Sequence, residues 1–110
     1  MVWRIGDRAT FELLRRSGRR ARRGPVTVTF AQAGSAPEPR VAYAVGRKVG
    51  NAVLRNRVRR RLRAAVAQTA ELPPGAYLVA AGPAAARQSF EELRRDVARA
   101  MTAASGRDPA

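Results

Sequence analysis

The chain has 110 residues and a formal net charge of +14, which comes from 22 basic and 8 acidic residues. This length corresponds to one domain with a modest core. Cys and His are absent, which excludes disulfides, thiolate metal sites and a histidine acting as a base. Because so large an excess of positive charge weakens a compact fold, we expect a polyanionic partner that neutralises it.

The hydropathy of the chain and its N-terminal residues indicate in which cellular compartment the protein is expected. No segment is long and apolar enough to span a bilayer, and the N-terminal residues lack the apolar run of a signal peptide. We therefore expect a cytoplasmic protein with no membrane partner. We treat residues 1–110 as a single domain, with an ordered core over 7–104 and a flexible tail over 105–110.

The first part of the chain predicts a helix followed by a basic segment. Asp7 is placed to cap a helix that carries Phe11 and Leu14 on its inner side and ends at Gly18. Residues 15–23 contain six cations and no acid. Their arginines either supplement contacts to phosphate or form a solubilising loop.

Two segments alternate as strands with one buried face do. In residues 26–31, larger apolar side chains alternate with Thr27 and Thr29. In residues 40–46, Val and Tyr alternate with small residues that leave the other face shallow. The small residues of this second strand are Ala42, Ala44 and Gly46.

The second half predicts helix, strand and helix. A basic helix over 51–70 opens on an asparagine cap, and the Pro and Gly residues of 72–75 stop it. Residues 76–82 form an apolar strand, and the last helix opens with Ser89 and Glu92 in capping-box spacing. The order helix-strand-strand-helix-strand-helix, with room for one more short strand, predicts an α+β fold of helices packed on a sheet.

The acidic residues are too few and too scattered to make the chain a catalyst by itself. Nucleases usually need a metal held by clustered carboxylates, or a histidine. Glu92 and Asp96 are four residues apart and could share an ion, but a helix cap and solvated partners for neighbouring arginines explain them better. The sequence also contains neither a P-loop nor a G-x-S-x-G elbow.

Residues 47–63 carry eight cations and no acid. Leu54, Val58 and Leu62 recur every four residues, so one side of this helix can pack on a core. The residues on the opposite side are Asn56, Arg59, Arg60 and Arg63. Ordinary solvated faces mix both signs, and like charges four apart destabilise a helix. The pattern therefore favours a bound polyanion, RNA or DNA.

The segment GRKVGNAVLRNRVRRRLRAA resembles the signature of the bacterial ribonuclease P protein family, roughly K-K-x-G-N-A-V-x-R-N-R-x-K-R-x-x-R. The residues that match letter for letter are Lys48, Gly50, Asn51, Ala52, Val53, Arg55, Asn56, Arg57, Arg60 and Arg63. Arg47 and Arg59 replace Lys and keep the charge. The surroundings also fit over residues 7–104, with one departure: Arg15 stands where the family often has a second aromatic.

This resemblance implies a fold and a function. The motif helix would form a left-handed crossover between parallel strands, and one copy of the protein would bind ribonuclease P RNA and the 5′ leader of precursor tRNA. The RNA, with Mg²⁺, would cleave the leader, so the protein is expected to be a non-catalytic accessory subunit without a metal site. The residues expected to bind RNA are Arg47, Lys48, Asn51, Arg55, Asn56, Arg57, Arg59, Arg60 and Arg63.

The shallow strand face predicts a trough for the single-stranded leader. Small side chains let a nucleotide approach the sheet, and stacking on an aromatic contributes about 1–3 kcal/mol per base. The candidate leader-binding residues are Phe11, Arg15, Thr27, Thr29, Ala42, Ala44 and Gly46. Phe11 could equally be a core residue, and the threonines qualify only if they share a face with the alanines.

The main alternative is a ribosomal or other structural RNA-binding protein, which would have the same charge pattern and no role in cleavage. A DNA-binding module and a stand-alone nuclease are further alternatives. Composition does not separate the first alternative from a ribonuclease P protein, whereas the motif favours the latter.

Overall fold

The computed structural model describes residues 3–5, 7–32, 38–69 and 71–106. In chain order its elements are β1 (Trp3–Arg4), α1 (Arg8–Ser17), β2 (Arg19–Arg23), β3 (Val26–Ala31), β4 (Pro39–Val45), the 3-10 helix η1 (Arg47–Val49), α2 (Ala52–Ala67), β5 (Gly75–Ala81), the 3-10 helix η2 (Pro83–Arg87) and α3 (Phe90–Ala104). Within this part of the chain the strands form one sheet in the order β1-β4-β5-β3-β2. The predicted α+β fold is confirmed.

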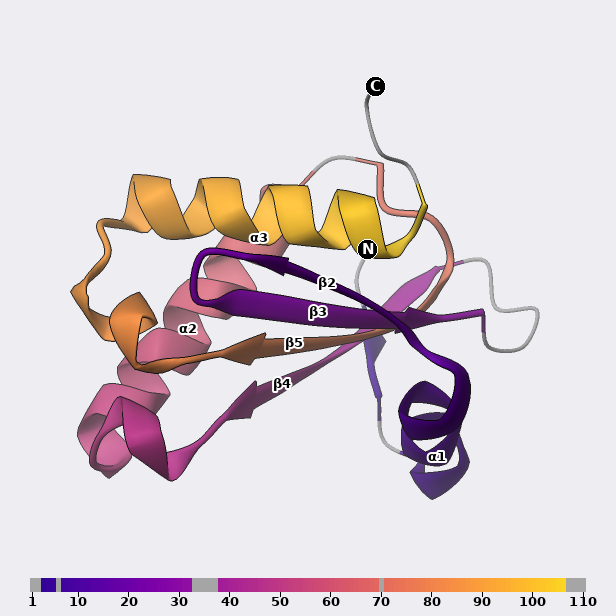
Figure 1. Ribbon diagram of the computed structural model, residues 1–110, viewed down its shortest axis with the longest axis horizontal. Coiled ribbons are helices and arrows are strands. Elements are labelled where there is room, and N and C mark those ends of the chain that lie inside the picture. Colours follow the sequence, from indigo (N-terminus) through magenta and orange to yellow (C-terminus); the bar gives the residue numbers. More distant parts are fainter. Residues whose placement is uncertain (1–2, 6, 33–37, 70, 107–110) are drawn as a thin grey trace.

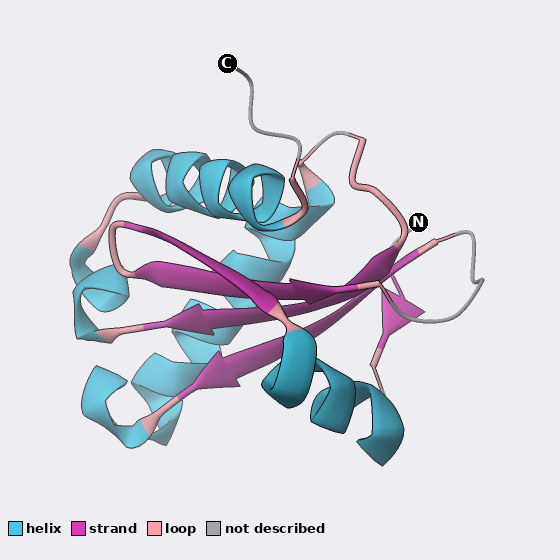
Figure 2. Ribbon diagram, turned by 45° about the vertical axis from the view of Figure 1, so that its right-hand side comes forward, coloured by secondary structure: helices cyan, strands magenta, loops and turns pink. Residues whose placement is uncertain are grey.

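Helices cover the two faces of the sheet unequally. Helices α2 and α3 pack on one face, and α1 lies against the opposite face at one end (Figures 1 and 2). Strands β4 and β5 are parallel neighbours, and β3 and β2 continue the sheet in antiparallel pairs. In Figure 1, β4 and β5 both run from right to left, β5 lies above β4 and α2 lies behind them. The β4-α2-β5 crossover is therefore left-handed, the rare hand.

The main core lies between the sheet and helices α2 and α3. Its fully buried side chains include Val28, Val41, Tyr77, Val79, Leu62, Leu93 and Met101. Removing this apolar surface from water is the main driving force for folding. A smaller cluster on the other face consists of Ile5, Leu14, Ala31 and Ala76, and it fixes α1 on the side that α2 and α3 leave open.

The residues that precede the helices form the predicted caps. At α3, the Ser89 hydroxyl accepts from the Glu92 amide at 3.1 Å, and the Glu92 carboxylate accepts from the Ser89 amide at 2.9 Å, which confirms the capping box. At α1, the Asp7 carboxylate accepts from the Thr10 amide at 2.9 Å. These short-range signals define where both helices begin.

The sequence interpretation allowed for one more short strand, and the described part of the structure has two that it did not assign, β1 and β2. Residues 19–23 pair in register with Val26–Phe30, whereas the sequence predicts only a basic segment there. Four of the five are arginine, and only Ala21 packs against the core, so the segment lacks the alternation that marks a half-buried strand. Backbone pairing with β3 holds it at the sheet edge, where arginines also discourage pairing with another chain.

The ends of the elements differ slightly from the predicted ones. Helix α2 ends at Ala67 rather than at residue 70, which lies outside the described residues. Of the expected tail, residues 107–110 also lie outside them, whereas Ser105 and Gly106 form the turn that ends α3. Among the described residues, no helix combines the length and apolar character needed to cross a bilayer.

Candidate nucleic-acid interface

Helix α2 has a buried side and an arginine-bearing side. Val58 and Leu62 are at most 1% exposed, and Ala65 is fully buried between the helix and the sheet. This confirms the predicted apolar stripe at Val58 and Leu62, whereas Leu54 at its start is only half-buried. The exposed polar residues of the other side include Asn56, Arg57, Arg60 and Arg63. Because packing against the core holds the helix in place, the backbone positions from which these side chains project are fixed.

The arginines of α2 keep their positive charges unpaired within the described part of the chain. The ion pairs found there all lie on other elements, and they are Arg15–Glu12, Arg40–Asp7 and Arg94–Glu91. Arg59 donates to the side-chain oxygen of Asn56 at 2.9 Å, which leaves the amide NH₂ of Asn56 to donate to another acceptor. Such an array of free guanidinium groups suits phosphate oxygens.

An aromatic ring orients one member of this array. The guanidinium carbon of Arg63 lies 5.5 Å from the centroid of the Tyr43 ring on β4, a cation–π contact. Burial raises the pKa of the Tyr43 hydroxyl, and the positive charge of Arg63 partly opposes this change. The ring therefore faces Arg63 as a neutral phenol and holds it beside β4.

Arg61 and Arg55 differ from the other arginines of α2. Arg61 donates to the backbone carbonyl oxygens of Gln88 at 2.7 Å and Ala85 at 3.4 Å, so it joins α2 to η2 and to the residues before α3. Arg55 is half-buried, and its Nε is shielded from solvent without an acceptor among the described residues. A buried donor without an acceptor costs free energy, and because this Nε is shielded from solvent, an outside acceptor does not reach it unless the Arg55 side chain moves.

The residues before α2 extend the array. Arg47 and Lys48 are exposed in η1, and Asn51 caps α2 by accepting from the Leu54 amide at 3.0 Å. Gly50 between them has a φ of +148°, and a Cβ at this position would lie 2.6 Å from Leu54 Cδ1. Glycine therefore allows η1 to pass directly into α2. The predicted RNA-binding residues thus lie on one continuous stretch of η1 and α2.

The sheet face opposite α2 and α3 carries the residues that were predicted to form the leader trough. Two rows cross this face, Thr29–Leu78–Ala42 and Thr27–Ala80–Ala44. The candidate threonines therefore do share a face with the candidate alanines. Gly46 follows at the end of β4, where an added Cβ would meet nothing within 4 Å. The face thus leads from α1 to η1, where the basic array begins.

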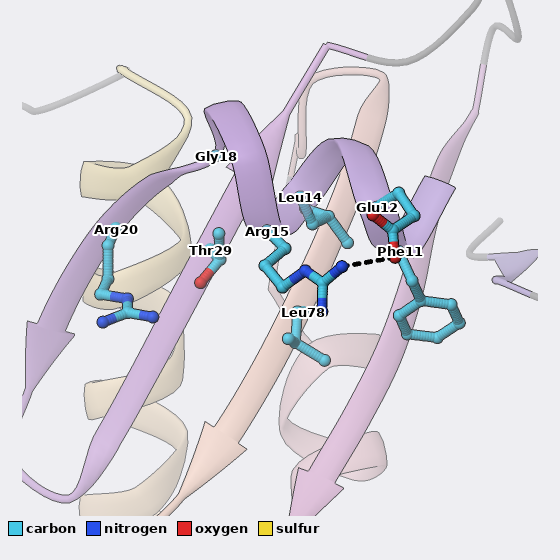
Figure 3. A pocket seen from close by; sticks show the side chains of 8 residues that line it. All are labelled: Phe11, Glu12, Leu14, Arg15, Gly18, Arg20, Thr29 and Leu78. Atoms are coloured by element: carbon cyan, nitrogen blue, oxygen red, sulfur yellow. Dashed lines mark hydrogen bonds and ion pairs between the residues drawn. The ribbon is translucent and has the colours of Figure 1, made fainter. Parts of the chain in front are cut away.

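A pocket of about 580 Å³ lies between α1 and the sheet at one end of this face (Figure 3). Its lining residues are Phe11, Glu12, Leu14, Arg15, Gly18, Arg20, Thr29 and Leu78. The Phe11 side chain is 41% exposed, so it is not a core residue and its ring can stack on a base. The pocket brings Phe11, Arg15 and Thr29 together, while the other candidate leader residues lie outside it.

Five of the eight pocket residues were not among the candidate leader-binding residues, and two of these five, Arg20 and Leu78, lie on strands of the sheet. Arg20 lies on β2 opposite Thr29, and Leu78 lies on β5 opposite the same residue. Assigning them requires the strand register, and the arginine-rich pattern of β2 gave no sign of a strand. Arg15 was predicted, but its guanidinium already pairs with Glu12 at 2.6 Å (Figure 3).

Close contacts hold α1 above the sheet. At Gly18 a Cβ would lie 2.3 Å from Thr29 Cγ2 and 2.4 Å from the Leu14 carbonyl oxygen, so glycine is needed where α1 turns into β2. At the other end, Arg40 of β4 donates to the Asp7 carboxylate and to the Thr10 hydroxyl, each at 3.4 Å. These contacts fix both ends of α1 relative to the sheet.

The Asp7 cap should make the attachment of α1 sensitive to acid. The hydroxyl and the amide of Thr10 both donate to Asp7, and they lower the pKa of its carboxyl. A lowered pKa stabilises the fold above the ordinary carboxyl range, and this contribution is lost as pH falls through the lowered pKa. Between neutral and acid pH, the melting temperature should therefore fall more for the wild type than for Asp7→Asn, because asparagine can cap the helix but does not titrate. Parallel curves would contradict this role.

Comparisons with known proteins agree with one another. The chain matches the family described as Ribonuclease P over residues 2–105. The ribonuclease P protein component of Micrococcus luteus is 43% identical over 111 residues, covering 89% of this chain and 84% of that protein. That of Thermus aquaticus is 45% identical over 96 residues, covering 87% of this chain and 56% of the relative.

Solved structures share the fold. The RNase P protein of Staphylococcus aureus superposes with a TM-score of 0.81 at 21% identity, covering 93% of this chain and 94% of that chain. The RNase P protein from Thermotoga maritima superposes with a TM-score of 0.79 at 23% identity, covering 91% and 96%. At these identities the likeness shows the fold alone.

Proposed function

The chain belongs to the ribonuclease P protein family, and on that premise we propose that it grips the catalytic RNA through η1 and α2 and holds the 5′ leader of precursor tRNA on its open sheet face. Family membership itself makes the chain a protein component of ribonuclease P, with ribonuclease P RNA as its partner. Neither a ribosomal nor a DNA-binding role has comparable support.

One observation carries the assignment of the RNA surface. Arg57, Arg60 and Arg63 project from a helix whose underside is packed against the core, and none of them pairs with a carboxylate in the described residues. A flexible basic tail would lose conformational entropy on binding. A packed helix has already lost most of it, so the array is preorganised for a folded polyanion.

Catalysis is proposed to belong to the RNA and its Mg²⁺. The whole chain lacks His and Cys, and the described residues contain no group of three acidic side chains able to hold a metal ion. The protein's part is then to position the leader and to neutralise phosphate charge, which helps Mg²⁺ and substrate to bind the RNA. A single array of this kind is consistent with one protein per RNA, and we propose that the complex acts in the cytoplasm.

The test is reconstitution. The purified chain alone is expected to leave precursor tRNA intact, and addition of the cognate RNA with Mg²⁺ at low ionic strength is expected to give cleavage at the 5′ end of the tRNA. A mock purification provides the control for contaminating nucleases. If the chain cuts on its own and the mock preparation does not, catalysis by the RNA is the wrong assignment.

A further inference from the structure

The arginines of β2 fall on two different sides of the sheet. Arg20 lies opposite Thr29, and Arg22 lies opposite Thr27. Directly opposed residues in an antiparallel pair share a face, so both arginines extend the two rows that form the leader trough. Arg19 and Arg23, on the same strand, point to the face covered by α3.

The two arginines on the open face have no acidic partner among the described residues. Arg20 is exposed and lines the pocket, with its side chain alongside Thr29 (Figure 3). Arg22 is exposed, and its Nε donates to the Gly24 carbonyl oxygen at 3.1 Å. This bond directs the guanidinium along the hairpin and leaves its two terminal nitrogens available to an anion.

The neighbouring rows offer a place for a nucleotide beside these charges. The side chains next to Arg20 and Arg22 across the sheet are Thr, Leu and Ala, which carry no charge, and those at Ala80 and Ala44 are small. Strand β2 is three strand spacings from β4, roughly 14 Å. A base lying over the small residues of β5 and β4 would therefore leave its phosphate near the arginine-bearing edge.

We propose that Arg20 and Arg22 form a clamp for the phosphates of the single-stranded leader, along the edge of the trough farthest from β4. The clamp rests on the proposed function, because it deepens the leader site, and it assigns a specific role to a strand that could otherwise be a solubilising edge. The leader would lie between two sets of contacts: Phe11 and the small residues for its bases, and the β2 arginines for its backbone.

Two double variants of equal charge test the clamp in the reconstituted holoenzyme. Arg20→Gln with Arg22→Gln removes the open-face pair, and Arg19→Gln with Arg23→Gln removes two charges from the same strand on the other face. Each is assayed on precursor tRNA with a long leader and with a leader of a single nucleotide. We expect the open-face variant to lower kcat/KM for the long leader by about tenfold or more, and to change the short one by less than about twofold.

Each other outcome has a definite meaning. Equal losses for both double variants would show a long-range charge effect and overturn the clamp. A loss on both substrates with the open-face variant would place Arg20 and Arg22 on the tRNA or the catalytic RNA, which also overturns it. If the wild type has the same kcat/KM for the long and the short leader, the proposed leader binding is wrong. If the wild type has a higher kcat/KM for the long leader and the open-face variant keeps this difference, only the clamp is wrong. Thermal melts verify that each variant is folded.

Discussion

Replacement of Arg57, Arg60 and Arg63 together by Gln is expected to weaken binding of ribonuclease P RNA by about 100-fold or more, because each charge-assisted contact to phosphate contributes roughly 1 kcal/mol or more. The fold should survive, since all three side chains are exposed and Val58 and Leu62 beneath them are unchanged. Titration of labelled RNA at several salt concentrations measures the effect. The dependence of log affinity on log salt should become shallower by about 2–3.

A control variant of the same charge separates contact from general attraction. Arg87, Arg95 and Arg99 are exposed on η2 and α3, outside η1 and α2, and their replacement by Gln also removes three charges. We expect this control to lose much less affinity and to keep most of the salt dependence. Similar losses in the two triple variants would mean that only the overall charge of +14 matters, and the preorganised array would have to be abandoned.

The parts of the fold that follow from local chemistry were predictable from the sequence. The caps at Asp7, Asn51 and Ser89 form as expected, because each side chain satisfies an amide only three residues away. The buried side of α2 follows from the spacing of Val58 and Leu62, since a helix repeats every 3.6 residues. Where a sequence pattern is both local and periodic, the secondary structure that it predicts depends little on the rest of the fold.

The parts that depend on distant pairing were not predictable in the same way. Strand β2 exists because its backbone pairs with β3, and an arginine-rich segment has no side-chain period that reveals this. The pocket needs Gly18 to bring α1 close to Thr29, and it needs Arg20 and Leu78 from two other strands. The exposure of Phe11 likewise follows from the docking angle of α1, which no short-range signal specifies.

Arg61→Ala is expected to lower the free energy of unfolding by about 2–3 kcal/mol, because hydrogen bonds from a charged group to two carbonyl oxygens are lost. The Gln88 carbonyl accepts from Arg61, and the Gln88 side chain donates to the Asp96 carboxylate of α3 at 2.8 Å. The substitution therefore loosens α2 from both η2 and α3. Chemical denaturation measures the loss, and the melting temperature should fall by about 10 °C or more.

Arg60→Ala is the matched control, because it removes the same charge one residue away from an exposed position. Its stability should stay within about 0.5 kcal/mol of the wild type, while its affinity for RNA falls. Arg61→Lys should recover part of the stability, since an ammonium can reach one carbonyl but lacks the planar fork that reaches two. If Arg61→Ala melts like the wild type and loses RNA affinity as Arg60→Ala does, Arg61 belongs to the array. Otherwise, two adjacent arginines of α2 have different roles. Arg60 presents its charge to RNA, and Arg61 holds α2 against η2 and α3.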